Sequence, residues 1–358
     1  MIDQQRSAQR RLRVLLLPAR PYTPYRMAYM AGTGPDPTAF TRELAALGID
    51  LDMLDPTGFP FNPLAGKHPL LRSLDPCRTM AVLLFKRKYD LIVSGNEGGA
   101  VLLALLRRCF LFRTPVVIWD LSPSTEWRLR ATLQDVTLPR VDGVFSLIEV
   151  QKSYVSQRWG AHVPVAVVGY GIDTEFYRPG APSTREDYIL SVGDDVGRDY
   201  QTLLQASIDL PVPLHIKTSL SLDLDPESHR DIVPLPNRLP HVEFRQLYQN
   251  CLFVVVPLQP HTRNASGAST VLEAGAMGKA VIVSDSDGVR DFVVPNETCI
   301  MVPAGDSAAL RTAMDRLCRE PETRRRLGEA ARQFVQQRYS MPAGASMFAA
   351  AVRQFARA

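Results

Sequence analysis

Cysteine is scarce in this sequence: only five of the 358 residues are cysteines, and they are far apart, with no C-x-x-C pair. Their scarcity argues against a disulfide framework and a cysteine-based zinc site, and it favours a reducing, cytoplasmic setting. Long hydrophobic runs are also lacking. The longest, at 100–106 and 251–258, fall far short of the roughly 20 residues of a membrane-spanning helix. The short apolar block at 14–17 therefore predicts a first strand, not a secretory signal.

The overall composition is that of a globular protein. Apolar residues make up 46% of the chain and charged residues 22%, which excludes intrinsic disorder as the main state. At roughly 150 residues per domain, the length predicts two domains. Glycine and proline cluster just after residue 167, so we place the domains at 1–166 and 167–340. A last helix at 341–358 is expected to pack back on the first domain.

Positive charge is concentrated in the first half. Residues 1–166 hold 21 Lys and Arg against 14 Asp and Glu, whereas residues 167–358 hold 20 against 23. Such a field attracts anionic lipid, a polyanion or a phosphorylated substrate, so peripheral contact with the inner face of an anionic membrane is one prediction. Nucleic acid is not an expected partner, because no recognised binding motif or interleaved aromatic pattern accompanies the charge.

Short apolar runs alternate with helical stretches in both halves, and this pattern predicts an α/β protein with a doubly wound parallel sheet in each. In the first half we expect strands at 13–17, 49–54, 90–94, 115–119 and 143–147, and helices at 37–47, 78–86, 100–108 and 150–159. In the second half we expect strands at 188–192, 213–217, 242–244, 251–256, 280–284 and 299–302, and helices at 200–207, 245–250, 269–277, 307–319, 322–339 and 343–358. Ligands of such sheets bind beyond the carboxyl ends of the strands, so two ligands are expected to meet in an interdomain cleft.

The clearest candidate site lies at 254–285, where a buried strand leads through a polar loop into a helix. Gly267 allows close approach of the backbone, and Ser269 is a natural N-cap. The free N–H groups and the dipole at such a helix start favour a phosphate. Glu273, one turn further on, can accept the hydroxyls of a ribose. The plain alternative is a serine-capped helix with a solvated glutamate.

A second loop, at 191–200, offers Gly193 and the forked donor Arg198, which suits a diphosphate. Lys217 adds a cation at the end of the strand 213–217. Taken alone, each is also typical of an ordinary strand–helix turn. The segment 169–171, Gly-Tyr-Gly, begins like a dinucleotide fingerprint, but Thr174 stands where its third glycine belongs, so a nicotinamide site is not predicted.

Several segments together resemble glycosyltransferase family 4. V-V-G-Y-G-I-D-T-E-F-Y-R-P at 167–179 resembles the family's linker, and V-L-E-A-G-A-M-G-K-A-V-I at 271–282 resembles its donor helix and the following strand. Residues 288–292, 302–306 and 338–340 fit the segments that follow. The resemblance is good over about 188–340 and extends to the first half only in outline.

The resemblance implies a retaining GT-B glycosyltransferase with two Rossmann-like domains, the second holding a nucleotide-sugar donor and neither needing a metal or other cofactor. Glu273 would hold the ribose, Ser269 and Thr270 would lie at the diphosphate, and Arg198 would replace the family's usual lysine. Two departures stand out. Ala265 occupies the place of the first carboxylate of the family's E-x7-E motif, and the family's Gly-Arg is Gly193–Asp194 here.

For the acceptor, the resemblance directs attention to polar residues that follow strands of the first half. Asp120 follows the strand where the family often has His-Asp, and it either binds a sugar hydroxyl or caps the next turn. Glu97, Gly98 and Glu149 follow two other strands and are further candidates for contacts with a glycan, lipid-linked or small-molecule acceptor.

The catalytic set predicted in this way is Arg198, Asp120 and Lys217. The two cations would stabilise the charge that grows on the leaving diphosphate, and a phosphate oxygen would take the acceptor's proton. Two alternatives stay open: a nucleotide-sugar epimerase of the same fold, and a non-catalytic family member that acts as a binding partner.

Overall fold

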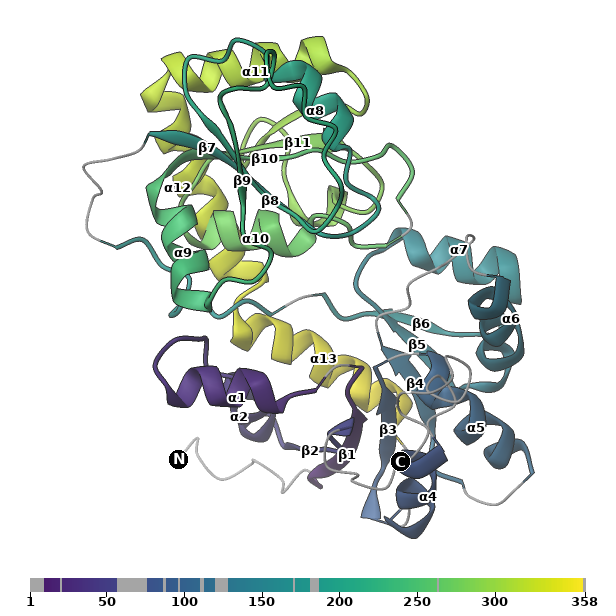
Figure 1. Cartoon of the computed structure of the whole chain (residues 1–358). Helices are drawn as coiled ribbons and strands as arrows, with labels where there is room; N and C mark the ends of the chain where they lie inside the picture. Colours follow the sequence, from purple (N-terminus) through teal and green to yellow (C-terminus); the bar gives the residue numbers. More distant parts are fainter. Residues whose placement is uncertain are drawn as a thin grey trace. The chain divides into compact units, whose positions relative to one another are not determined.

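The computed structural model describes residues 10–19, 21–56, 76–85, 88–95, 97–109, 113–119, 128–169, 171–180, 187–262 and 264–356. The chain forms two compact units (Figure 1). The first unit comprises Met1–Met27, Pro37–Gly169 and Gly344–Ala358, and the second comprises Ala28–Asp36 and Tyr170–Ala343.

The first unit is built on a six-stranded parallel sheet with the order β2-β1-β3-β4-β5-β6. Its strands are β1 (Leu12–Leu17), β2 (Ile49–Met53), β3 (Leu91–Ser94), β4 (Val116–Trp119), β5 (Gly143–Ser146) and β6 (Val165–Val167). Its helices are α2 (Ala39–Ala46), α4 (Pro76–Phe85), α5 (Glu97–Arg108), α6 (Arg128–Thr137), a 3-10 turn at Leu138–Arg140, and α7 (Val150–Trp159). The central strands are continuously apolar because parallel sheets are covered on both faces, and residues such as Ile92 and Ile118 are fully buried.

The second unit carries a six-stranded sheet with the order β12-β11-β10-β7-β8-β9. Its strands are β7 (Tyr188–Val192), β8 (Leu214–Lys217), β9 (Ile232–Leu235), β10 (Cys251–Val256), β11 (Val281–Asp285) and β12 (Ile300–Pro303). The helices are α8 (Tyr200–Ala206), α9 (His241–Asn250), α10 (Ala268–Ala276), a 3-10 turn at Arg290–Phe292, α11 (Ser307–Arg319) and α12 (Pro321–Arg338). The chain runs outward from β7 to one edge and then from β10 to the other, which is the Rossmann order. The predicted pair of doubly wound sheets is therefore confirmed.

The last helix, α13 (Met341–Phe355), completes the core of the first unit although it is the end of the chain. The Phe348 ring lies 5.4 Å from that of Phe145, edge to face, and 4.9 Å from that of Trp119. A side chain at Gly143 would collide with Phe355, so glycine is needed where this helix crosses β5. Aromatic packing thus ties the chain's end to its first half.

One predicted strand is wrong. Residues 242–244 alternate apolar and polar side chains like a strand, but they form the start of α9. Pro240 is the N-cap residue of this helix and has an extended conformation, with φ −55° and ψ 146°. Glu243 lies in the first turn, where the helix dipole favours a carboxylate. The buried ring of Tyr248 fixes the face that packs inward.

Two strands were not predicted, and both are at sheet edges. β9 contains Pro234, a residue that sheets tolerate at an edge because no N–H is needed there. β6 has only three residues, all half-buried. Edge strands carry a weak hydrophobic signal because one side of each lacks a neighbouring strand.

Helix α1 (Thr23–Met30) was not predicted either, and none of its residues is buried. It exposes the large side chains Tyr25, Met27, Tyr29 and Met30, with Met30 at 76%. In the part of the chain that the structure describes, no helix combines the length and the apolar character needed to cross a bilayer.

Candidate functional site

The two central strands of the second sheet define where a ligand can bind. β7 and β10 are neighbours, and the chain leaves them toward opposite edges, so their carboxyl ends flank the topological switch point. The loops that follow them are joined. The N–H of Asp199 donates to the Pro257 carbonyl at 3.1 Å, and that of Gln259 donates to the Gly197 carbonyl at 2.8 Å. Both predicted loops therefore lie at one place in the fold.

Helix α10 starts at this switch point. Its N-cap is Gly267, in left-handed conformation with φ +79°, and the first helical residue is Ala268. The prediction of Ser269 as the N-cap is thus wrong: glycine reaches a conformation that would strain serine, so the helix begins earlier. Ser269 lies in the first turn and is exposed. The first-turn N–H groups of such a helix favour an anion.

Arg198 fastens the loop after β7 to the first turn of α10. Its Nη2 donates to Oγ1 of Thr270 at 2.9 Å, and its Nε donates to Asp195 at 3.1 Å. The Thr270 hydroxyl in turn donates to the Val192 carbonyl at 3.2 Å. Only 2% of the Arg198 side chain is exposed. Its Nη1 is buried and has no hydrogen-bond partner among the described residues, so the N–H groups of this nitrogen remain for a ligand.

Gly193 is required by the position of this guanidinium. A Cβ built on Gly193 would overlap the Nε and Cζ atoms of Arg198. A Cβ built on Gly197 would likewise come too close to the hydroxyl of Ser266, which donates to Asp195. The glycines of the predicted loop therefore make room for side chains that link the two loops.

Lys217 ends β8, as predicted, but it is already paired. Its ammonium donates to Oδ2 of Asp194 at 2.7 Å, and Oδ1 of Asp194 accepts the N–H of Ser219 at 2.6 Å. Burial opposes ionisation of Asp194, yet the hydrogen bonds from Lys217 and Ser219 outweigh it and lower the pKa of the carboxyl. The residue that replaces the family's arginine thus neutralises the neighbouring lysine.

Glu273 lies on α10, about one turn beyond Thr270, the residue of this helix that Arg198 contacts. Its Oε2 accepts a hydrogen bond of 2.8 Å from the hydroxyl of Tyr248, and Tyr177 adds a second. Burial raises the pKa of the Glu273 carboxyl to about 7, while these two hydrogen bonds and the charges of Arg198 and Lys217 limit the rise. The structure thus brings together Gly193, Arg198, Lys217, Gly267, Ser269, Thr270 and Glu273, all in the second unit.

Tyr248 and Tyr177 are site residues that sequence reasoning missed. Tyr248 is fully buried in α9, whose first turn was taken for a strand, and Tyr177 lies in the segment before β7. No spacing in the sequence relates either tyrosine to Glu273. The only signal was the apolar character of α9 around Tyr248, and it does not predict a polar contact.

The candidate acceptor residues belong to the first unit. Glu97 and Gly98 open α5 directly beyond β3, and Glu149 precedes α7 beyond β5. Because β3, β4 and β5 are adjacent, these residues share the carboxyl edge of the sheet. The exposed Glu149 carboxylate pairs with Lys152 at 2.7 Å. Asp120 lies outside the described residues.

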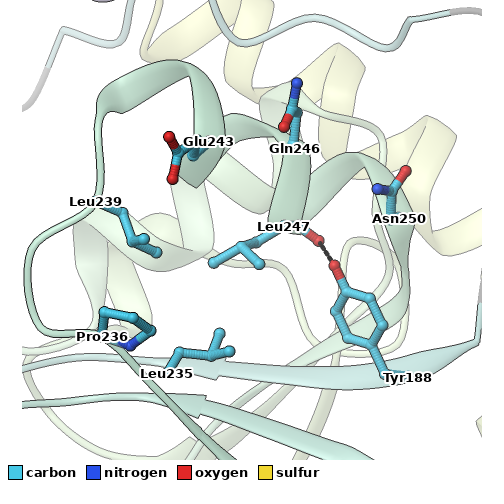
Figure 2. A pocket seen from close by; sticks show the side chains of 8 residues that line it. All are labelled: Tyr188, Leu235, Pro236, Leu239, Glu243, Gln246, Leu247 and Asn250. Atoms are coloured by element: carbon cyan, nitrogen blue, oxygen red, sulfur yellow. Dashed lines mark hydrogen bonds between the residues drawn. The ribbon is translucent and has the colours of Figure 1, made fainter.

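A hollow of about 390 Å³ lies elsewhere on the second unit, against α9 (Figure 2). Its wall includes Tyr188, whose hydroxyl donates to the Leu247 carbonyl at 2.9 Å. The full lining is Tyr188, Leu235, Pro236, Leu239, Glu243, Gln246, Leu247 and Asn250. None of the residues predicted to bind a ligand is among them. Within the described ranges, no three His, Cys, Asp or Glu side chains gather as a metal site would require.

Comparison with known families gives a match in the same region. Residues 228–334 match the family described as Glycosyl transferases group 1. The matched segment includes α10 with Glu273 and begins after Arg198 and Lys217. Comparison with curated proteins gives no match.

Solved structures resemble nearly the whole chain. Sucrose-phosphate synthase (tll1590) from Thermosynechococcus elongatus superposes with a TM-score of 0.74 at 19% identity, covering 96% of this chain and 99% of that one. Alr3699/HepE from Anabaena, in complex with UDP and glucose, gives 0.67 at 15%, covering 96% and 100%. A glycosyltransferase from Rickettsia africae ESF-5 gives 0.66 at 14%, covering 97% and 99%.

The likenesses in structure and the two parallel six-stranded sheets define a two-domain GT-B fold. Together with the group 1 match, they identify the chain as a glycosyltransferase enzyme. The fold and enzyme class expected from the sequence are thereby confirmed.

The raised pKa of Glu273 predicts how stability depends on pH. The folded value, about 7, lies above the ordinary value of 4.5, so the fold favours the protonated form. This stabilisation is present below about pH 4.5 and is lost as the pH rises through 7. The glutamine of Glu273→Gln cannot ionise. When the pH is raised from 4.5 to 8, the free energy of unfolding of this variant should therefore fall by about 1–2 kcal/mol less than that of the unsubstituted protein. This figure is smaller than the full pKa difference implies because the side chain is partly exposed.

Urea unfolding followed by circular dichroism measures this difference. Glu297→Gln, at an exposed carboxyl on the same unit and outside any helix, is the matched control. Parallel pH profiles for Glu273→Gln and the unsubstituted protein would show that Glu273 titrates normally.

Proposed function

We propose that this enzyme is a retaining glycosyltransferase of family 4 that moves a sugar from a nucleoside diphosphate to a hydroxyl of a glycan, lipid-linked or small-molecule acceptor. One observation carries the proposal: three features meet at the switch point of the second sheet, namely the start of α10, the carboxylate of Glu273 and the Nη1 of Arg198, which has no partner within the described part of the chain. Two of the similar structures, both of HepE, contain UDP with glucose or UDP-glucose, which supports a nucleotide-sugar donor.

The arrangement suits the two polar parts of a nucleoside diphosphate. The diphosphate would lie against the first-turn amides at Ser269 and Thr270, where the helix dipole favours negative charge. Glu273 lies about one helical turn, roughly 5.4 Å, further along the axis. That offset allows its carboxylate to accept hydroxyls of the ribose while the phosphates remain at the helix start.

In the reaction we propose, the bond between the sugar's C1 and the leaving phosphate oxygen breaks first. Negative charge then grows on the β-phosphate, where the free N–H of Arg198 and the ammonium of Lys217 would stabilise it. The acceptor hydroxyl attacks C1 from the same face, its proton passing to a phosphate oxygen, and the anomeric configuration is retained. Because side chains and amides supply the positive charge, we propose that no metal is needed.

Acceptor binding is assigned to the first unit. Glu97, Gly98 and Glu149 would contact the acceptor from the carboxyl edge of that sheet, and the support is their placement after β3 and β5. Asp120 is proposed as a catalytic or acceptor-binding carboxylate from its position in the sequence alone.

The decisive experiment incubates the enzyme with UDP-glucose, GDP-mannose and ADP-glucose in turn and follows the anomeric protons by NMR. We expect turnover of one donor, release of its sugar with retained configuration, and no loss of rate in EDTA. Glu273→Ala should raise the donor KM by ~10-fold or more because a charged hydrogen-bond acceptor is lost, whereas Glu243→Ala should not. Inverted product would contradict the retaining mechanism, and dependence on a metal would contradict the role given to the cations.

A second prediction concerns the ion pair beside the diphosphate. Asp194→Asn removes the charge that occupies Lys217 while keeping an oxygen for the Ser219 amide. Nucleoside diphosphates should therefore bind about three- to tenfold more tightly, most clearly at low ionic strength, where charge interactions are least screened. Isothermal titration measures the change. The exposed Asp223→Asn serves as control, and weaker binding by Asp194→Asn would mean that Lys217 does not face the diphosphate.

Contact with an anionic membrane stays a proposal from the charge of the first half, and the exposed Tyr25, Met27 and Tyr29 of α1 support it. Neutralising Lys86, Arg87 and Lys88 together should lower co-sedimentation with phosphatidylglycerol vesicles but not with neutral vesicles. Neutralising Arg319, Arg325 and Arg326 in the second unit is the control. Binding that is indifferent to salt and to the first substitutions would refute the contact.

A further inference from the structure

Tyr248 contacts the Glu273 carboxylate from the core of the second unit. The ring is fully buried, 5.3 Å from Phe244 and 6.4 Å from Tyr177, each in an edge-to-face arrangement. Its hydroxyl donates to Oε2 of Glu273 at 2.8 Å. Aromatic packing on two sides fixes the ring, so the direction of the hydrogen bond is fixed as well. A buried hydroxyl held in this way determines where the carboxylate can point.

The contact between Tyr248 and Glu273 limits how many further hydrogen bonds the carboxylate can accept. An ionised carboxylate has about four acceptor sites. The hydroxyls of Tyr248 and Tyr177 use two of them, since burial raises the pKa of both phenols and keeps them protonated as donors. Two sites remain, which is the number that the 2′ and 3′ hydroxyls of one ribose require.

We propose that Tyr248 is a positioning residue that orients the Glu273 carboxylate and favours its ionised form, with two acceptor sites left for the paired hydroxyls of a donor ribose. The inference rests on the proposed function and deepens it. It gives the site a preference for ribonucleotides over deoxyribonucleotides, and it assigns that preference to a tyrosine that does not itself touch the nucleotide.

The electrostatic surroundings of Glu273 explain why the hydroxyl of Tyr248 affects the ionisation of this carboxyl. Four groups face the carboxylate: Tyr248 from α9, Tyr177 from the segment before β7, Arg198 from the loop after β7, and Lys217 from β8. Burial raises the pKa of Glu273 to about 7, and the hydrogen bond from Tyr248 is the first of the opposing influences. Without that bond, the pKa should rise further and leave the carboxyl mostly protonated at pH 7.

The test compares Tyr248→Phe with Tyr188→Phe. Each change removes the hydroxyl of one buried tyrosine. The Tyr248 hydroxyl donates to Glu273, whereas the Tyr188 hydroxyl donates to the Leu247 carbonyl of α9. Two measurements are made on each protein. The first follows the titration of the Glu273 carboxyl by 13C NMR without ligand, with the signal assigned by comparison with Glu273→Gln. The second measures the binding of UDP and of 2′-deoxy-UDP between pH 6 and pH 9. GDP or ADP with its deoxy analogue replaces UDP if either binds more tightly.

For Tyr248→Phe we expect the Glu273 pKa to rise by ~1 unit and UDP to bind ~10-fold more weakly at pH 7. Affinity should recover at higher pH, and the preference for UDP over 2′-deoxy-UDP should shrink. Tyr188→Phe should match the unsubstituted protein in all of these. A pKa unchanged by Tyr248→Phe, or an equal change in both variants, would overturn the inference.

The two measurements separate this inference from the proposed function. If the unsubstituted protein binds no nucleoside diphosphate, the donor site is refuted, and the ribose preference with it. The ligand-free titration still decides whether Tyr248 controls Glu273. If UDP binds and Tyr248→Phe leaves both affinity and selectivity unaltered, the donor site stands and the positioning role falls. Should Tyr248→Phe fail to fold, Tyr177→Phe, which removes the other donor, is measured in the same way.

Discussion

A single buried guanidinium holds the candidate site together. Arg198 reaches from the loop after one central strand to the helix after the other, and its contacts with Thr270 and Asp195 use two of its five N–H donors. The arrangement requires glycine at 193, since any side chain there would occupy the same space. It also sets the start of α10, because Thr270 is bonded both to Arg198 and to the end of β7. The geometry proposed to bind an anion thus depends on an interaction that is mostly internal.

Both cations at this site are paired. Asp194 neutralises Lys217, Asp195 pairs with Arg198, and Glu273 adds a third carboxylate nearby. A strongly positive pocket would bind any phosphate, whereas a site whose cations are paired exposes little positive charge until a ligand displaces an internal partner. In the proposed donor site, directed donors, namely the Nη1 group of Arg198 and the amides of α10, would then contribute more to recognition than net charge does. Recognition in such a site depends on geometry more than on general attraction.

Much of the fold could be predicted from the sequence because buried parallel strands are short, continuous apolar runs. β7 and β10 match the predicted ranges, and α11 does so at both ends. The exceptions have physical causes: Pro234 disguised an edge strand, and the alternation at 242–244 imitated a strand within α9. At the site, motifs located Arg198, Lys217 and Glu273, since each stands at a strand end or a helix start. What Asp194 and Tyr248 do could not be predicted, because those contacts join residues that only the tertiary fold brings together.

The aromatic cluster under α13 has a consequence for synthesis on the ribosome. Phe145 and Trp119 lie in the first half of the chain, but Phe348, which covers them, is translated only after the second unit. Until then the nascent first unit presents an uncovered aromatic surface, while the whole of the second unit is made and begins to fold. Completion of the core of the first unit is therefore postponed until the second unit has been synthesised, and a nascent chain that stops before Phe348 exposes a surface suited to chaperones.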